Sequence, residues 1–496
     1  RQFGAVAALA DGQLKELVHV PERDETIVPL GRDNAEGARI YRRSLAFLLV
    51  TAIEELYPDA QVFIDYSVPF GGYFCQLLTE PQFTDEELME IESHMRAIVD
   101  SDEPITRIIV PAEEAKDIFN SRGECDKIAL VDRRGRTNIS MYQLRNRRDV
   151  FYGYMVPSAG YLDTFGLVRM EEGFVLQFPL RAAPATIKTP YATPRLTGVF
   201  REYGDWLRLL RIENLAQINE IIRRGRISET ILVSEALHER SIAVVAKDIA
   251  ARSGVKVVLI AGPSSSGKTT FSKRLAIQLM THGVRPMTLE MDRYFVNRED
   301  TPRDRNGEYD FEAFEALDVA LLNRDLEDLV EGRTVHVPAF DFRKGRRREG
   351  PEMQLGDDQI VIIEGIHGLN PSAISALSSD VIFRVYVSAL TQLNIDRHNR
   401  VLTSDTRLLR RIVRDATQRG WSADDTLGMW ENVQRGEKRN IFPYQENADA
   451  VFNSALVYET AVLKPFVSPL LLKVHRESPN CEIGRASCRE RVCHRV

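Results

Sequence analysis

The distribution of apolar and polar positions divides the chain into regions with different predicted secondary structure. Up to about residue 185, short β-rich runs such as 62–64, 107–110 and 173–178 alternate with stretches of helical spacing. This alternation predicts an α+β region. The clearest helix spans residues 41–56, because its apolar residues recur three or four positions apart: Leu45, Leu48, Leu49, Ala52, Ile53 and Leu56.

Two further regions follow a proline-rich stretch that contains Pro184, Pro190 and Pro194. Residues 197–252 carry an apolar face at helical spacing, which predicts a helical linker. From Val255 onward, apolar strands alternate with helices in the order that builds a parallel sheet. The sequence therefore predicts a multidomain protein: an α+β N-terminal half, a helical linker, and an α/β domain with a parallel sheet at residues 253–480.

The composition narrows the function classes. Of 496 residues, 44% are apolar, and 65 Lys+Arg against 72 Asp+Glu give a net charge of −7. The apolar fraction excludes wholesale disorder, and no apolar run reaches the roughly 18 residues that a membrane span needs. The acidic balance argues against a general nucleic-acid coat. Cys75 and Cys125 form no CxxC motif, which fits a reducing cytoplasm rather than a disulfide framework or a zinc ribbon.

Both ends of the sequence look unnatural. The chain starts at Arg1 without Met, so we expect it to be a fragment. Residues 482–492 read EIGRASCRERV, which resembles a sequencing adapter translated as coding sequence. We expect residues 482–496 to be an artefact that replaces the natural C-terminus after about Asn480, and leave them out of the fold.

A phosphate-binding loop follows the apolar strand at residues 255–261. The sequence GPSSSGKTT at residues 262–270 satisfies GxxxxGK[ST], and a helical stretch continues at residues 271–280. Small residues let backbone N–H groups surround phosphate oxygens, and the helix N-terminus adds partial positive charge. We expect Lys268 to reach the β- and γ-phosphates and Thr269 to bind Mg²⁺. The predicted nucleotide-binding residues are Gly262, Ser264, Ser265, Ser266, Gly267, Lys268, Thr269 and Thr270.

Two acids end the next predicted strands. Asp292 follows the strand at 288–291, and Glu364 ends the apolar strand at 359–363. Ligands of open α/β folds bind at the carboxyl ends of the strands. Asp292 is suited to accept the proton of an attacking hydroxyl, with a helix cap as the alternative. Glu364 is suited to hold Mg²⁺, directly or through water.

Two basic segments complete the candidate chemistry. Residues 337–348, VPAFDFRKGRRR, combine aromatic and basic side chains that could stack on a base, or simply form a solvated loop. In the stretch 396–415, six arginines outnumber three aspartates, so pairing within the segment cannot neutralise them. We expect this mostly helical segment to close over a triphosphate, with an exposed basic helix as the alternative. The arginines are Arg397, Arg400, Arg407, Arg410, Arg411 and Arg414.

These motifs together resemble the uridine kinase and phosphoribulokinase family of P-loop kinases. The resemblance covers residues 255–479 and rests on GPSSSGKTT, MDRYF, YDFE, VPAFDF, IIEG and TRLLRRIVRD in the family's order. It implies ATP and Mg²⁺ as cofactors, Asp292 as base toward a nucleoside 5′-hydroxyl, and Asp310 as a ribose contact. Phe340 and Phe342 would flank the base. Arg410 and Arg414 would act in catalysis, and Arg407 and Arg411 would bind ATP in the lid.

This chain departs from that pattern at two places. Uridine–cytidine kinases have a His after the second aromatic residue, where this chain reads Arg343-Lys344-Gly345, so the preferred base stays open. The spacing between Asp310 and Asp318 also differs.

The N-terminal half resembles parts of other proteins. Residues 1–30 resemble a remnant of a TGS domain, and residues 35–185 resemble the second additional (editing) domain of threonyl- and alanyl-tRNA synthetases. The latter resemblance rests on RSLAFLL at 43–49, ELYP at 55–58 and FYGYMVP at 151–157. The synthetase ligands of HxxxH and CxxxH correspond here to Arg43, Phe47, Phe151 and Met155. Because these side chains cannot form such a metal site, we expect the domain to keep its fold without editing chemistry.

The leading hypothesis is an ATP- and Mg²⁺-dependent nucleoside kinase. The alternatives are a kinase for another small alcohol, such as a sugar phosphate or pantothenate, and an RNA-binding regulatory ATPase. The last of these would need a basic surface in the N-terminal half, for which only Arg42, Arg43, Arg145, Arg147 and Arg148 are candidates. We expect a small-molecule partner, no membrane and a cytoplasmic location, and a homo-oligomer stays open.

Overall fold

The computed structural model of the chain describes residues 4–475 and 478, apart from residues 80, 171, 305, 306, 308, 342 and 343. Phe342 and the adapter-like segment at 482–496 therefore lie outside the described residues. Within the described part, no helix is both long and apolar enough to cross a membrane.

The N-terminal domain, residues 4–183, contains three small antiparallel sheets. The first has the order β2-β1-β3, from β1 (Ala5–Ala10), β2 (Gln13–Lys15) and β3 (Ile27–Gly31). The second has the order β4-β5-β10-β9, from β4 (Val62–Val68), β5 (Gly72–Leu77), β9 (Gly166–Met170) and β10 (Gly173–Gln177). The third has the order β6-β7-β8, from β6 (Ile105–Pro111), β7 (Asn138–Leu144) and β8 (Arg147–Asp149). The helices are α1 (Ala35–Leu56), α2 (Asp85–Asp100), α3 (Ala112–Ser121) and α4 (Cys125–Arg134).

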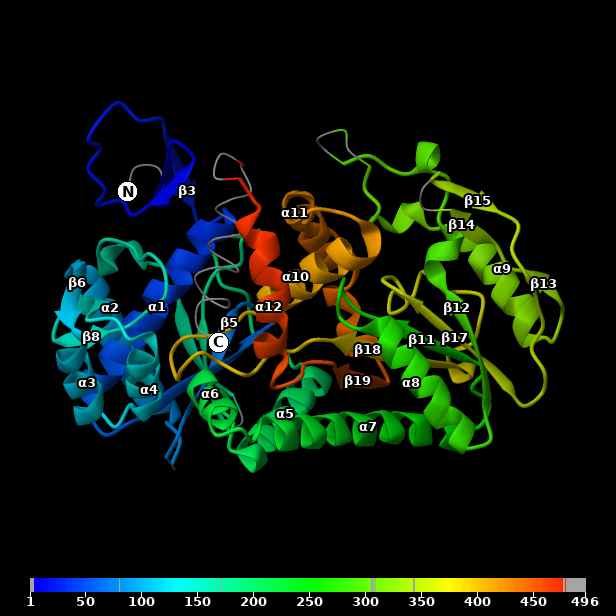
Figure 1. Cartoon of the computed structure of the whole chain (residues 1–496), viewed down its shortest axis with the longest axis horizontal. Helices are drawn as coiled ribbons and strands as arrows, with labels where there is room; N and C mark the ends of the chain where they lie inside the picture. The colour runs from blue at the N-terminus through cyan, green and yellow to red at the C-terminus, as the bar shows by residue number, and fades with distance from the viewer. Residues whose placement is uncertain are drawn as a thin grey trace.

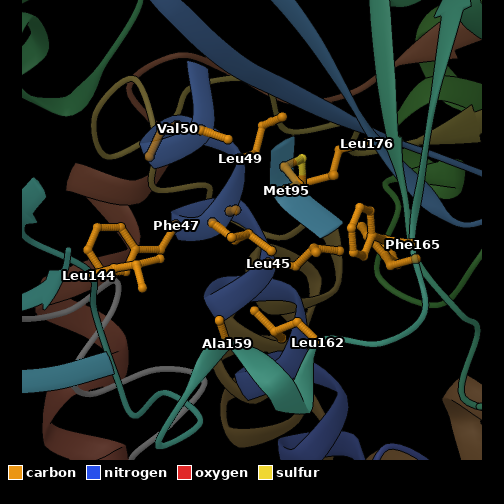
Figure 2. Close-up of a cluster of buried hydrophobic side chains, with 14 of the residues drawn as sticks. Leu45, Phe47, Leu49, Val50, Met95, Leu144, Ala159, Leu162, Phe165 and Leu176 are labelled. Carbon is orange, nitrogen blue, oxygen red and sulfur yellow. The ribbon is translucent and has the colours of Figure 1, made fainter. Parts of the chain in front are cut away.

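Helix α1 is the centre of this domain's core. It begins where the Asn34 side chain accepts hydrogen bonds from the backbone N–H groups of Glu36 and Gly37, which satisfies donors of the first turn. The helical face predicted from the sequence is buried, and Figure 2 shows its residues packed against Met95 of α2 and Leu176 of β10. Burial of these apolar side chains holds the surrounding sheets on one core.

Three helices follow the N-terminal domain: α5 (Pro194–Leu210), α6 (Leu215–Arg223) and α7 (Ile227–Ala251). They do more than connect. Residues of α5 and α6 enter a hydrophobic core that also contains Val110 and Phe119 of the N-terminal domain. Helix α7 packs through Ile242 and Val245 on one face of the next sheet, and Figure 1 shows it running beneath that sheet.

The C-terminal domain, residues 253–475, is built on a five-stranded parallel sheet in the order β12-β17-β11-β18-β19. Its strands are β11 (Val257–Ala261), β12 (Arg285–Glu290), β17 (Gln359–Gly365), β18 (Ile382–Ser388) and β19 (Ala450–Asn453). Two small hairpins add β13 (Val335–His336) with β16 (Glu352–Met353), and β14 (Ala339–Asp341) with β15 (Arg346–Arg348). The helices are α8 (Lys268–Thr281), α9 (Val319–Val330), α10 (Thr403–Arg414), α11 (Ala423–Asn440) and α12 (Glu459–Leu472).

The two domains share a core and an extended connection. Helices α10, α11 and α12 lie between the N-terminal domain and the parallel sheet (Figure 1). The segment 389–402, which leads from β18 into α10, runs along β4 of the N-terminal domain. Ile64 N–H donates to the Arg397 carbonyl at 2.9 Å, and the Asn394 side chain donates to the Ile64 carbonyl at 3.0 Å. The start of α10 is thus held by the N-terminal domain.

Candidate active site

The phosphate-binding loop lies between β11 and α8, as the sequence predicts. All five residues of β11 are buried between β17 and β18, so the loop leaves the middle of the sheet. Gly262 must be glycine, because a Cβ there would lie 1.9 Å from the Val387 carbonyl oxygen. Gly267 has a φ of +89° directly before α8, a conformation that L side chains rarely adopt. These two glycines determine the shape of the loop.

Lys268 is the first residue of α8, and its ammonium group lies against the loop. Its Nζ donates to the carbonyls of Gly262 at 2.9 Å and Pro263 at 3.2 Å. Burial lowers the pKa of Lys268, while the carboxylates of Glu364, Asp292 and Glu312 act in the opposite direction. A buried ammonium near three acids lies where phosphate oxygens would need a counter-charge.

Thr269 and Glu364, the two predicted metal residues, are in direct contact. The Thr269 hydroxyl lies 2.8 Å from one carboxylate oxygen of Glu364 and 3.0 Å from the other. Burial raises the pKa of Glu364, against the hydrogen bond from Thr269 and the charge of Lys268. One hydroxyl and one carboxylate fit Mg²⁺, which binds few protein oxygens and takes its other ligands from phosphates and water.

We expect Glu364→Gln to raise the Mg²⁺ concentration needed for half-maximal activity by at least about tenfold, because a neutral amide is a weaker ligand than a carboxylate. The measurement is initial rate against free Mg²⁺ at saturating ATP. Glu352→Gln, an exposed change on β16, is the control and should leave the requirement unchanged. An unaltered Mg²⁺ requirement in Glu364→Gln would remove this residue from the metal site.

Asp292 lies in the 3₁₀ turn Met291–Tyr294 that follows β12. Strand β12 pairs with β17 so that Glu290 is opposite Glu364, which brings Asp292 to the same end of the sheet as the phosphate loop. Burial raises the pKa of Asp292 to about 6, with Lys268 lowering it and Glu364 raising it further. Because Asp292 and Lys268 each perturb the other's pKa, the two groups are close enough to interact.

Glu312 is an acidic residue that the sequence analysis did not select. Its carboxylate has one oxygen that is buried and has no hydrogen-bond partner in the described structure. Burial raises the pKa of Glu312 to about 7, with Glu437 adding to the rise and Arg411 and Lys268 opposing it. Its position depends on Gly436, because a Cβ there would come within 2.3 Å of the Glu312 Cβ. The YDFE motif contains this residue, but the family resemblance points to its neighbour.

That neighbour, Asp310, has a different environment. One carboxylate oxygen accepts a hydrogen bond from the Glu312 backbone N–H at 3.2 Å, and the other faces Arg439 at 3.4 Å. The first contact is a local turn of the kind that Asp commonly makes. Asp310 therefore shapes the segment, whereas Glu312 is the group that interacts electrically with Lys268 and Asp292.

The arginines of α10 have partners that the sequence could not reveal. Arg407 donates to the Ser264 carbonyl at 2.9 Å and pairs with Glu437, and Arg411 donates to the Ser264 hydroxyl at 2.7 Å. Glu437 also accepts from the Ser264 backbone N–H at 3.1 Å. Two arginines and one glutamate thus form hydrogen bonds with Ser264 of the phosphate loop.

The other two arginines of the predicted lid are also paired. Arg410 forms a two-point contact with Glu459 of α12, both distances being 2.6 Å, and Arg414 lies 2.8 Å from Asp415. Pairing within the segment does not neutralise these arginines, as the sequence analysis expects. Carboxylate partners of Arg407, Arg410 and Arg397 come from α11, α12 and the N-terminal domain. Whether these arginines contact ATP stays a prediction.

The β14–β15 hairpin packs against the segment that follows Asp292. Phe340 on β14 meets Phe295 edge to face, with ring centres 6.1 Å apart. A neighbouring cavity of about 400 Å³ is lined by Arg298, Glu299, Tyr309, Lys344 and Arg346. The predicted aromatic contact at Phe340 is therefore beside a pocket with three cationic side chains and one acidic one.

Comparison with known proteins agrees with this geometry. Residues 257–461 match the model of the Phosphoribulokinase / Uridine kinase family. This segment is therefore similar to the P-loop kinase domains of that family. Among solved structures, the chain resembles a possible uridine kinase from Bacillus stearothermophilus (23% identity, 43% of this chain and 98% of that one, TM-score 0.27). It also resembles D-glycerate 3-kinase from Cryptococcus neoformans (16% identity, 42% and 87%, TM-score 0.27). Residues 253–475 are called the kinase domain below.

In the N-terminal domain, the four positions compared with synthetase ligands lie together. Phe47 and Phe151 are buried with ring centres 5.2 Å apart, and Met155 is buried in the same core. Figure 2 shows Phe47 among apolar side chains near Leu144. Arg43 donates to the Tyr154 carbonyl, and its guanidinium lies against Gly153, where a Cβ would come within 2.7 Å of it. Apolar packing and one arginine occupy these positions.

Curated relatives match the N-terminal half. Threonine–tRNA ligase of Burkholderia ambifaria is 36% identical over 171 residues, which are 34% of this chain and 27% of that protein. The enzyme of Acidithiobacillus ferrooxidans is 35% identical over the same length, 34% of this chain and 26% of the relative. The chain thus spans about a quarter of the length of these curated relatives. The resemblance to threonyl-tRNA synthetases is confirmed for this region.

A buried ionic cluster joins the two domains. The Lys127 ammonium lies 2.5 Å from an Asp149 oxygen, 3.1 Å from a Glu124 oxygen and 2.7 Å from Nδ1 of His398, which belongs to the kinase domain. Burial and the nearby Lys127 lower the pKa of His398 to about 4, so its neutral Nδ1 accepts from the ammonium. Among described residues, Glu124, Asp149 and His398 are the one group arranged as metal ligands could be. Lys127 supplies the cation between them.

Proposed function

We propose that the chain transfers the γ-phosphoryl group of ATP to the 5′-hydroxyl of a nucleoside of the uridine or cytidine type. The observation that carries this proposal is that Asp292 and Lys268 follow β12 and β11, the two parallel strands on either side of β17, and that each perturbs the pKa of the other. A phosphate-binding cation and a carboxylate base within one site are what phosphoryl transfer to an alcohol requires. The family match of residues 257–461 supports the same reaction class.

Each residue of the site has a distinct task in this proposal. The backbone of residues 262–268 holds the phosphates of ATP, and Lys268 balances their charge. Thr269 and Glu364 would hold Mg²⁺, which neutralises charge that develops on the phosphates when it is bound. Asp292 accepts the proton of the attacking hydroxyl, and Glu312 is placed to accept a hydrogen bond from another hydroxyl of the acceptor. Arg410 and Arg414 act nearest the transferred group, if their acid partners release them.

A second acceptor class is favoured by the pocket next to Phe340. Among the lining residues that the structure describes, Arg298, Lys344 and Arg346 are cationic and Glu299, which pairs with Arg346, is acidic. A neutral nucleoside has no group that needs three cations, whereas a sugar phosphate or a carboxylate-bearing alcohol does. The second candidate is therefore a kinase for a small anionic alcohol that uses the same catalytic residues.

One experiment separates these candidates. The full chain is incubated with ATP, Mg²⁺ and single acceptors from a panel of nucleosides, sugar phosphates and hydroxy acids, and ADP and phosphorylated product are both measured. The first proposal expects a nucleoside monophosphate with uridine or cytidine. Product only with anionic alcohols would select the second candidate, and Arg346→Gln should then raise KM for that acceptor. Equal ATP hydrolysis with and without every acceptor would contradict both and favour a regulatory ATPase.

We further propose that the N-terminal domain keeps a synthetase-like fold without editing chemistry. The packed Phe47, Phe151 and Met155 support this, because none of them offers a lone pair that suits Zn²⁺ at the former ligand positions. Most of the basic residues considered for RNA contact are engaged: Arg147 with Asp149 and Glu124, Arg148 with Glu114, and Arg145 with Glu55. Arg42 is the one residue of this set without a hydrogen bond or ion pair in the described structure.

A further inference from the structure

Arg42 belongs to a group of cations where the N-terminal domain meets the kinase domain. The guanidinium of Arg42 lies over the ring of Phe178, 4.8 Å from its centre. Phe178 packs edge-on against Tyr73, with ring centres 4.7 Å apart, and Arg400 of the kinase domain lies 5.0 Å over the Tyr73 ring. Two arginines from different domains therefore flank one aromatic pair.

Two more cations join this group, one of them from helix α11. Arg181, three residues after Phe178, pairs with Glu431 of α11 at 2.9 Å. Lys438 follows Glu431 by seven residues and therefore lies on the same face of the helix, two turns further on. Lys438 is exposed, so the group can be reached from solvent on this side. We call Arg42, Arg181, Arg400 and Lys438 the interdomain cation group.

The charges in this group are not balanced. Arg181 has Glu431, and Arg400 donates to the Asp65 carbonyl and the Ser67 hydroxyl. Arg42 and Lys438 have no hydrogen bond or ion pair within the described structure, and Nε of Arg42 is buried without a partner. Burial lowers the pKa of Arg42, with Arg39, Arg181 and Arg400 adding to the effect against Tyr73. Although Lys438 can be reached from solvent, partial desolvation of its ammonium, together with Arg181 and Arg42, lowers its pKa, against Glu431 and Glu437.

We propose that the interdomain cation group binds a phosphate group, with Arg42 and Lys438 as its direct contacts. A guanidinium and an ammonium without ion-pair partners supply the charge and the N–H donors that a phosphate accepts. The cations come from separate segments and converge at one place between the domains. This suits a single phosphate-bearing small molecule better than an RNA backbone, which needs a longer basic track.

This site is next to the machinery that holds the phosphate loop. Lys438 directly follows Glu437, which accepts from the Ser264 N–H and pairs with Arg407. A phosphate bound at Lys438 would therefore act on α11 one residue from the contacts with Ser264. The proposal does not depend on which alcohol the kinase domain phosphorylates.

Calorimetry on the full chain tests the proposal. Lys268→Met serves as the background, so that the phosphate loop does not contribute, and inorganic phosphate and a nucleoside monophosphate are titrated separately. We expect one binding site, with affinity lowered at least about tenfold by Arg42→Met or by Lys438→Met. Arg285→Met, an exposed arginine paired with Asp358, is the control and should bind as the background does. Tighter binding of the nucleotide than of phosphate would identify a nucleotide as the source of the group.

A stability measurement distinguishes this role from a structural one. In phosphate-free buffer, Arg42→Met should raise the unfolding temperature, because it removes a repelled cation and keeps a side chain on Phe178. The same change should abolish the additional rise that phosphate gives to the background protein. Three results would overturn the proposal. The Lys268→Met background could fail to bind phosphate, or the Arg42 and Lys438 variants could bind it undiminished. The protein could also bind an RNA hairpin but neither small anion.

Discussion

Replacement of Asp292 by Asn is expected to lower the rate of phosphoryl transfer by about 10²–10⁴-fold, the range that a positioned general base contributes. The amide cannot accept the proton of the acceptor hydroxyl, yet it has nearly the same size as the carboxylate. Lys268 and the loop at residues 262–270 are unchanged, so the dissociation constant of ATP should stay within about threefold, or less than about 1 kcal/mol. Initial rates with the best acceptor and calorimetry with ATP measure the two quantities.

Glu290→Gln is the matched control for this change. Glu290 is the last residue of β12 and is exposed, so its replacement removes one negative charge near the same strand end and leaves the Asp292 carboxylate in place. An Asp292→Asn enzyme that retains more than a tenth of the wild-type rate would contradict the assignment of Asp292 as the base, whatever the control does.

The pH dependence of the rate offers a further control of the same assignment. A general base works as the carboxylate, and burial raises the pKa of Asp292 to about 6. The value of kcat/KM should therefore rise as the pH increases through about 6 and level off above it. Burial raises the pKa of Glu312 to about 7, so kcat/KM would rise through about pH 7 instead of 6 if Glu312 were the base. A rise in kcat/KM near pH 7 that disappears in Glu312→Gln would identify Glu312 as the general base.

Replacement of Lys127 by Met is expected to lower the free energy of unfolding by about 3–5 kcal/mol, the usual cost of removing one partner from a buried ion pair. The change leaves Asp149 and Glu124 in the interior without the ammonium between them. Against the effect of burial, Lys127 lowers the pKa of Glu124 to about 2 and that of Asp149 well below its usual range. Urea unfolding followed by tryptophan fluorescence measures the loss.

The loss of stability in Lys127→Met should depend on pH in a definite direction. Because the pKa of Glu124 is depressed in the folded chain, its contribution is present above the pKa of the unfolded carboxyl and is lost as the pH falls toward about 2. Lys127→Met should therefore be least damaging in acid, where these carboxyls are protonated. Lys116→Met, which removes a partly exposed ammonium that pairs with Glu113 and Asp132 near the surface, is the control and should change the unfolding midpoint far less. An equally stable Lys127→Met protein would show that the cluster contributes nothing net.

The same cluster is a buried contact between the two halves of the chain. His398 comes from the segment that leads into α10, and α10 carries the arginines that form hydrogen bonds with Ser264. A disturbance at Lys127 therefore reaches the phosphate loop through a short, continuous set of contacts. The shared core of Val110 and Phe119 with Leu408 and Leu409 acts in the same direction.

The candidate site shows how far local sequence information extends. The phosphate loop, Thr269, Asp292 and Glu364 could be selected because each lies at or just after the end of an apolar strand, and the ends of parallel strands meet at one edge of a sheet. Phe340 could be selected from a compact aromatic motif. Asp310 and Glu312 are two residues apart in one motif, so composition could not say which of them interacts with Lys268. That choice depends on the approach of Gly436, more than 120 positions later in the chain.

The sequence alone was enough to predict the α/β character of the C-terminal domain, helix α1 and the acidic residues near the strand ends, because hydrophobic period and motif spacing act over a few residues. The tertiary structure was needed to show which carboxylates pair with the arginines of α10 and that Lys127 contacts His398. It was also needed to show that Arg42 and Lys438 have no ion-pair partner among the described residues. The pairs Arg407–Glu437, Arg410–Glu459 and Lys127–His398 are 30, 49 and 271 positions apart. Their energies depend on burial and on distances between side chains, which no local pattern encodes.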